Sequence, residues 1–197
     1  MNTSYLKSLV EKLGVWGVQF EGGLSDQEII NAEDTFGFVF PQDLRMFLQH
    51  ALPTSKGWPN WRNGSREDIQ QQIDWPFEGM CFDIEHNVFW MHQWGDRPEN
   101  LTEAFSVARE HVTHAPFLIP VLGHRYIPAE PGRAGNPVIS VYQTDIIHYG
   151  NDLASYFANE FKADSDVLPQ WHVPCPDWAA TSPRPIRFWD DIIEMNG

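Results

Sequence analysis

Hydrophobic and polar positions follow helical spacing over residues 24–53 and predict two consecutive helices. Ser25 and Glu28 have the spacing of a capping box, which begins the first helix. Gly37 stands where a left-handed C-terminal cap would end that helix. Pro41 suits the first turn of the second helix, because the N–H that proline lacks would be unsatisfied there.

The rest of the chain predicts a mixture of helices and short strands. Amphipathic spacing indicates a helix in the first dozen residues and later helices that begin near Pro98, at Asn151 or Asp152, and at Phe188. Apolar or alternating runs predict strands in 116–122, 138–142 and 145–149, and a hairpin over Met80–Trp90 with its turn at His86 and Asn87. Two segments, 53–79 and 164–185, are rich in turn-forming residues, although 65–73 could form a short helix.

Helices followed by several short strands, without strict alternation, predict an α+β fold. The sheet is expected to be antiparallel or mixed, with the helices packed mainly on one of its faces. A length of 197 residues and a hydrophobic fraction of 42% suit one domain that spans residues 1–197.

The charge balance narrows the classes of partner. The chain has 13 basic and 27 acidic residues, for a formal net charge of −14. A field of this sign repels nucleic acid and anionic membranes, and it speeds encounter with a basic protein. No run approaches the ~18 apolar residues of a membrane span, and the N-terminus does not resemble an export signal. With only Cys81 and Cys175, which are typical of unpaired thiols, we expect a cytoplasmic protein.

Motifs for metal binding or nucleophilic catalysis are weak. His111 and His114 form one close pair, and His172 lies near Cys175, but zinc sites need paired ligands from two segments. Cys81 lies in an apolar strand-like pattern, where a thiol is usually inert. We therefore predict no metal, no cofactor and no catalytic residue.

Tryptophan and paired acids leave a glycan-directed function open. The chain contains 9 tryptophans, and Asp190 with Asp191 or Asp83 with Glu85 could form a carboxylate pair of the kind that glycosidases use. Tryptophan more often fills cores and interfaces, and adjacent acids are more often solvated charges. Glycan binding or hydrolysis is therefore an alternative, not the main prediction.

The most informative polar group is His124-Arg125-Tyr126 together with Asp145, which flank the central strands. An Arg125–Asp145 ion pair could fix a loop against the sheet. A binding role is the other interpretation, because arginine and tyrosine are enriched at interface hot spots. The candidate partner-binding residues are Trp90, Arg125, Tyr126, Tyr142 and Asp145.

Several of these segments resemble the SUKH superfamily, which is named for the yeast Smi/Knr cell-wall regulator and includes bacterial immunity proteins. The opening motifs are Ser25-x-x-Glu28-Ile29, Glu33-x-x-Phe36-Gly37 and Phe40-Pro41-x-Asp43-Leu44-x-x-Phe47-Leu48. Residues 81–90, 118–128 and 135–150 and the closing Phe188-Trp189-Asp190 continue the resemblance, which covers about residues 24–190.

The resemblance implies an α+β domain without catalytic residues. It also implies a bacterial immunity protein that neutralises a cognate toxin domain by direct binding. The acidic charge suits such a role, because nuclease toxins tend to be basic. The alternatives are a regulatory scaffold in cell-wall or signalling pathways, as in the fungal relatives, and the glycan-binding protein or hydrolase considered above.

Overall fold

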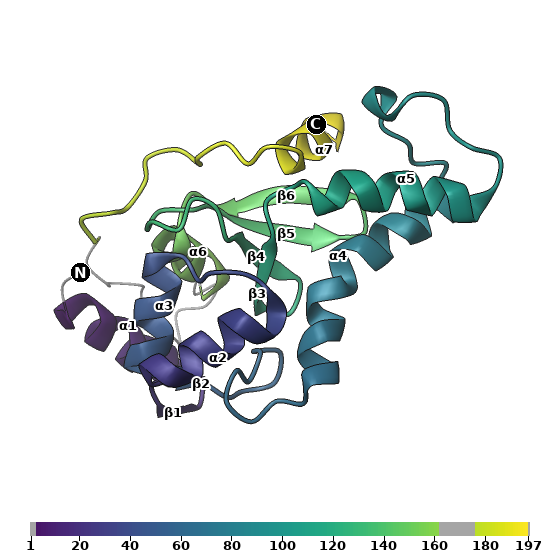
Figure 1. Cartoon of the computed structure of the whole chain (residues 1–197). Coiled ribbons are helices and arrows are strands. Elements are labelled where there is room, and N and C mark those ends of the chain that lie inside the picture. The colour runs from purple at the N-terminus through teal and green to yellow at the C-terminus, as the bar shows by residue number, and fades with distance from the viewer. Residues whose placement is uncertain (1–2, 162–175, 197) are drawn as a thin grey trace.

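The computed structural model describes residues 3–161 and 176–196, and Figure 1 shows their arrangement. In chain order the elements are α1 (Thr3–Val15), β1 (Phe20–Gly22), α2 (Asp26–Phe36), α3 (Gln42–His50), β2 (Ala51–Pro53), α4 (Arg66–His86), the 3-10 helix η1 (His92–Trp94), α5 (Leu101–Thr113), β3 (Leu118–Leu122), β4 (Arg125–Pro128), β5 (Val138–Tyr142), β6 (Asp145–Gly150), α6 (Leu153–Glu160) and α7 (Trp189–Asn196).

Two antiparallel sheets confirm the predicted α+β fold. The larger sheet has four strands in the order β3-β4-β5-β6, so each strand pairs with its neighbour in sequence. The smaller sheet pairs β1 with β2, neither of which the hydrophobic pattern had predicted. Strands β3, β5 and β6 confirm the three predicted strand segments, whereas β4 was not predicted.

Helices cover both faces of the larger sheet, so the expectation that they pack mainly on one face is wrong. Ile119 and Val121 of β3 join the core cluster formed with α1, α2, α3 and α6. Ile139 and Val141 of β5 join a second cluster with α4, α5 and α7. The reason lies in the strands themselves. β3 and β5 are buried at almost every position, and strands apolar at successive positions need cover on two sides.

The prediction of a hairpin over Met80–Trp90 is wrong as well, because most of this segment belongs to α4. This helix begins after the N-cap Ser65, runs for 21 residues and contains Pro76 in its interior. Its inward side chains Met80 and Ile84 have helical spacing. The alternation that suggested a strand arose because a polar residue, Asp83, occupies a buried position of the helix, where its carboxylate accepts the hydrogen bonds described below.

Helix caps follow the sequence signals closely. Ser25 and Glu28 form the predicted capping box, and Gly37 has the left-handed φ of 76° that a C-terminal cap requires. Asp152 caps α6, as one of the two predicted candidates. None of the helices within the described residues is long and apolar enough to cross a membrane.

A buried carboxylate ties α3 to the connection between β4 and β5. Asp43 is 1% exposed, and its Oδ2 accepts a hydrogen bond from the N–H of Gly135 at 2.9 Å. Burial raises the pKa of Asp43 to about 6, and the hydrogen bonds from Gly135 and Leu44 oppose this shift. The C-terminal segment holds the same connection, because Arg184 donates hydrogen bonds to Asn136 Oδ1 and Ala134 O.

Candidate functional site

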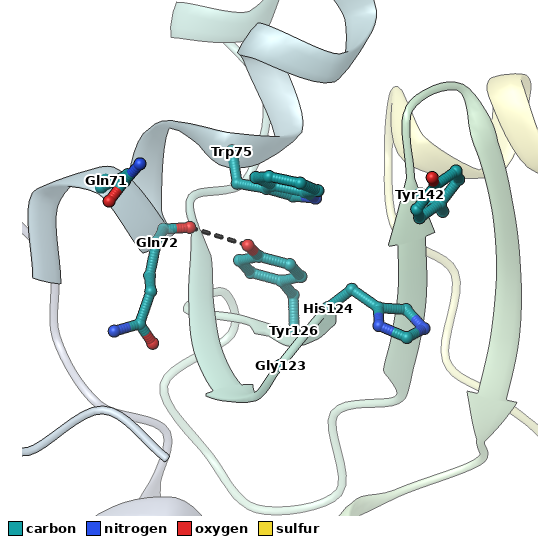
Figure 2. Close-up of a pocket in the computed structure, with 7 residues that line it drawn as sticks. All are labelled: Gln71, Gln72, Trp75, Gly123, His124, Tyr126 and Tyr142. Atoms are coloured by element: carbon teal, nitrogen blue, oxygen red, sulfur yellow. Dashed lines mark hydrogen bonds between the residues drawn. The ribbon is translucent and has the colours of Figure 1, made fainter. Parts of the chain in front are cut away.

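A pocket of about 420 Å³ opens between the first half of α4 and the β3–β6 sheet. Figure 2 shows side chains from the helix on one side and from the strands on the other. The lining residues are Gln71, Gln72, Trp75, Gly123, His124, Tyr126 and Tyr142. The residues from α4 and those from the sheet and its turn are 48 to 71 positions apart in the sequence, so only folding brings them together.

Pro76 explains how the floor of this pocket is built. Proline has no N–H, so it cannot donate the usual helical hydrogen bond to the carbonyl of Gln72, four residues earlier. The hydroxyl of Tyr126 donates to this carbonyl instead, at 2.7 Å (Figure 2). Tyr126 is 1% exposed and is thereby locked between the sheet and the helix. Figure 1 shows α4 changing direction part-way along its length, as an interior proline would cause.

A second junction fixes the position of the β5–β6 hairpin, which carries Tyr142. The carboxylate of Asp83 accepts hydrogen bonds from the N–H and the hydroxyl of Thr144, at 2.8 and 2.5 Å. One helical turn earlier, a Cβ added to Gly79 would lie only 2.7 Å from the Cα of Gln143. The hairpin turn therefore packs directly on the backbone of α4, and this contact sets the spacing between Tyr142 and the helix.

Two titratable side chains that line the pocket, Tyr126 and His124, are uncharged at pH 7. Burial raises the pKa of Tyr126, and the carboxylate of Glu78 adds to this effect, so the phenol remains protonated. Partial burial and then the nearby Arg125 guanidinium lower the pKa of His124. The histidine ring is accordingly neutral at pH 7, and it offers a nitrogen acceptor.

The predicted binding residues separate into two groups. Tyr126 and Tyr142 line the pocket. Asp145 is exposed, and it lies beside Tyr142, with which it pairs at the end of the β5–β6 hairpin. Trp90 does not line the pocket, and its indole N–H instead donates to Gly95 O at 2.7 Å in the segment between α4 and α5.

Arg125 has a structural partner other than the predicted one. Its Nε donates to Glu160 Oε2 at 2.9 Å and its Nη1 to Ser140 Oγ at 2.8 Å. The guanidinium also lies over the ring of Tyr149, 3.9 Å from the centroid. The suggested Arg125–Asp145 pair is therefore wrong: the arginine joins the sheet to α6.

Sequence reasoning did not place Gln71, Gln72 and Trp75 in the site, because it predicted at most a short helix over 65–73 within an otherwise irregular segment, 53–79. The signal that could have found this helical wall of the pocket is the apolar spacing of Ile69, Ile73 and Phe77, which lie in the core or pack against it. These positions continue a helical stripe across Pro76. Proline usually marks a turn or the end of a helix, whereas Pro76 only bends this one.

Exposed aromatic and acidic side chains surround the pocket. The exposed fractions are 41% for Trp75, 45% for Phe82 and 57% for Tyr142. Helix α4 also carries the acidic residues Glu67, Asp68, Asp74, Glu78, Asp83 and Glu85, against the single arginine Arg66. Apart from Asp83, these acids are exposed or half-buried, so this face of the molecule combines aromatic surface with negative charge.

The acids considered for hydrolysis are engaged in structural contacts. Asp83 holds Thr144, as described above, and Asp190 bonds to His148 Nε2 at 3.0 Å and accepts from Ile186 N at 2.8 Å. His111 stacks on Trp94 with ring centroids 5.3 Å apart. Within residues 3–161 and 176–196, no three His, Cys, Asp or Glu side chains are grouped as a metal ion would require. His172 and Cys175 lie outside these residues.

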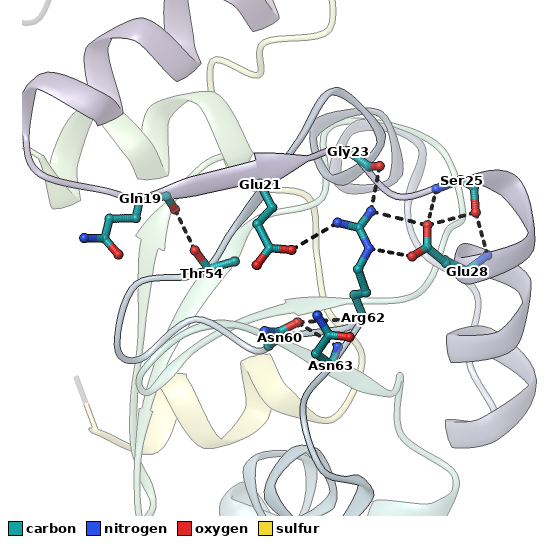
Figure 3. Close-up of polar contacts among 9 residues, drawn as sticks. All are labelled: Gln19, Glu21, Gly23, Ser25, Glu28, Thr54, Asn60, Arg62 and Asn63. Atoms are coloured by element: carbon teal, nitrogen blue, oxygen red, sulfur yellow. Dashed lines mark hydrogen bonds and ion pairs between the residues drawn. The ribbon is translucent and has the colours of Figure 1, made fainter.

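A further polar cluster, shown in Figure 3, centres on Arg62. Its Nε donates to Glu28 Oε1 at 2.5 Å, and its two terminal nitrogens reach Glu21 Oε2 at 3.2 Å and Gly23 O at 2.9 Å. The Arg62 hydrogen bond lowers the pKa of Glu28 to about 2, and those from Ser25 add to this effect. Every nitrogen of the guanidinium is used, so this cluster joins the 58–64 loop to β1 and α2 and does not offer a ligand site.

Comparison with protein-family models, with curated proteins and with solved structures finds no match to this chain. The SUKH resemblance therefore stays a prediction from the quoted motifs. The candidate site rests on its own geometry, namely the pocket and the exposed residues on α4 and the β5–β6 hairpin.

Proposed function

We propose that this chain is a non-catalytic, cytoplasmic binding protein that neutralises a basic cognate toxin domain by direct contact. The observation that carries the proposal is the grouping of Trp75, Phe82 and Tyr142, large aromatic residues left exposed around one junction. Isolated exposed apolar residues are ordinary, but tryptophan and tyrosine that gather beside a pocket are typical of protein-binding hot spots. We call the surface formed by α4 and the β5–β6 hairpin the binding face.

The charge of the binding face supports a basic partner. Helix α4 exposes acids along its length, and the whole chain has a formal net charge of −14. Such a field raises the rate of encounter with a positively charged protein and disfavours acidic competitors. The aromatic rings then supply contact area that becomes desolvated on binding.

The binding face is also held in place before any partner arrives. The Asp83–Thr144 hydrogen bonds and the close approach at Gly79 join the hairpin to α4. A rigid face loses little conformational entropy on association, which favours tight binding. Immunity proteins need tight binding, since a toxin that escapes is harmful at low concentration.

Capture of the product of the adjacent gene tests the proposal directly. The purified chain should form a stable complex with a basic domain of that product, and co-expression should abolish the toxicity of that domain. Failure to bind any basic domain encoded beside it would refute the proposal.

Charge reversal on the binding face gives a sharper test. In Glu78→Lys combined with Glu85→Lys, the association rate should fall about tenfold at low salt, with a smaller loss at high salt. The matched control reverses two exposed acids on other helices, Glu11 and Asp34. If both double variants slow association equally, net charge acts but the binding face does not.

Glycan binding is the second candidate, because a pocket with an exposed indole and two glutamine amides also suits a sugar ring. A glycan array separates the two functions. A saturable glycan hit that Trp75→Ala abolishes, together with no protein complex, would favour the glycan-binding function over the proposed one.

A further inference from the structure

The walls of the pocket leave aromatic faces available to a flat ligand. In Figure 2 the rings of Trp75 and Tyr142 lie on different sides of the pocket, and the Tyr126 ring forms its floor. His124 stands edge-to-face with Tyr142, with ring centroids 6.4 Å apart. Rings arranged in this way present the negative face of their π systems to a ligand, and that face attracts cations.

One buried acceptor at the pocket lacks a donor from the part of the chain that the structure describes. Gln72 Oε1 is covered from solvent and has no hydrogen-bond partner among the described residues. The other polar group at the floor, the Tyr126 hydroxyl, already donates to the Gln72 carbonyl. A buried, unpaired acceptor is costly, so a ligand that brings N–H donors would relieve this cost.

The surrounding charge has the sign that a cation requires. The adjoining depression on α4 shares Gln71 with the pocket and holds three carboxylates against one guanidinium: Glu67, Asp74 and Glu78 against Arg66. The nearest arginine on the sheet, Arg125, is committed to Glu160 and Ser140. The pocket is therefore bordered mainly by carboxylates, and the Arg125 guanidinium beside it is already paired.

Building on the proposed function, we infer that this pocket receives an arginine side chain of the basic partner. A guanidinium is planar and stacks on Trp75 or Tyr142, and its fork of N–H groups matches the free oxygen of Gln72. Lysine would satisfy the charge, but it carries a compact, strongly hydrated ammonium that does not stack. The aromatic walls thus select arginine over lysine.

A pair of short peptides tests this inference without the partner. The probes are acetyl-Gly-Arg-Gly-amide and the same peptide with citrulline, which keeps the planar shape and about three of the five N–H donors but lacks the charge. The indole N–H resonance of Trp75, assigned by its loss in Trp75→Phe, should move in a saturable way with the arginine peptide. Binding of the citrulline peptide should be about fivefold weaker or more, since cation–π attraction contributes about 1 kcal/mol at such a site. Equal binding of the two peptides, equal binding of a lysine peptide, or no shift with any of them would overturn the inference.

Two variants of α4 provide the internal control. Trp75→Ala should weaken the arginine peptide about fivefold, whereas Phe82→Ala should leave it unchanged. Phe82 is as exposed as Trp75, but it stacks on His86 and does not line the pocket. Both side chains lie at the surface, so thermal unfolding should confirm intact folds. An equal loss in the two variants would contradict a specific role for the pocket.

The two proposals can fail separately. If the captured toxin domain binds wild type and Trp75→Ala equally, the arginine inference fails and the proposed function stands. If the arginine peptide binds but no basic protein forms a complex, the proposed function fails and the pocket keeps its specificity for a guanidinium.

Discussion

The hydrogen bond from Tyr126 to the carbonyl of Gln72 can be measured by a double-mutant cycle with Pro76. Tyr126→Phe removes the hydroxyl that lies 2.7 Å from the carbonyl and leaves this acceptor without its donor. Such a loss costs about 1–3 kcal/mol. We expect the free energy of unfolding to fall by about 2 kcal/mol and the Tm by about 4–8 °C, since a chain of this size loses about 2–4 °C per kcal/mol.

The same substitution should cost much less in a Pro76→Ala background. Alanine restores the backbone N–H at this position, and that group can donate to the Gln72 carbonyl in the ordinary helical manner. Tyr126→Phe should then lower stability by less than about 1 kcal/mol, which gives a coupling of at least about 1 kcal/mol between the two sites. Urea unfolding at pH 7, followed by circular dichroism, gives the free energy of unfolding of wild type, of each single variant and of the double variant, and hence the coupling.

A second tyrosine provides the control for this cycle. The Tyr156 hydroxyl is also buried but has no hydrogen-bond partner among the described residues. Tyr156→Phe should therefore be neutral or slightly stabilising. The explanation of the proline bend would be refuted if Tyr126→Phe had the same cost with and without Pro76, or if Tyr156→Phe were equally destabilising.

Three further predictions follow from contacts elsewhere in the molecule. Gly79→Ala should destabilise by about 1–3 kcal/mol, because its Cβ would strike the hairpin backbone, whereas Gly14→Ala, with nothing within 4 Å, should stabilise by about 0.5–1 kcal/mol; thermal unfolding of both tests this contrast. Arg62→Met should return the pKa of Glu28 from about 2 toward 4.5, as carboxyl NMR titration would show, and wild type should lose its stability advantage over this variant as pH falls from about 4.5 to about 2. Burial raises the pKa of Asp43 to about 6, so the stability that its protonated carboxyl contributes is fully present below pH 3.8 and is lost as pH rises through about 6. The free energy of unfolding of wild type relative to Asp43→Asn should therefore fall over this range. Urea unfolding at pH 4 and 7 measures this difference, and an unchanged value would contradict the raised pKa.

Local signals predicted local structure well, and tertiary contacts explain the failures. The capping box at Ser25 and the left-handed Gly37 are set by neighbouring residues, so the chain around them could be predicted with its boundaries. The position of Asp83 is set by Thr144, which lies 61 residues away, and this burial created a false strand pattern. The smaller sheet escaped prediction because β1 and β2 have only three residues each.

The candidate site could be predicted only in part, because tertiary contacts bring its residues together from distant segments. Tyr142 was found on a strand with a strong apolar pattern, and Tyr126 was found because arginine and tyrosine that flank predicted strands are enriched at interface hot spots. Trp75 was missed because Pro76 next to it is usually a helix breaker. Only the hydroxyl of a distant tyrosine makes that proline acceptable inside α4, and no local pattern reports such a partner.

The structure beneath the pocket leaves no room for substitution, whereas the residues at the rim of the pocket can be replaced. Tyr126 is almost completely buried and Gly79 has no room for a side chain, whereas Gln71, Trp75 and Tyr142 face solvent and support no other part of the core. Diversification confined to those three rim positions would leave the scaffold folded. A display library built on them could therefore redirect this chain toward new targets.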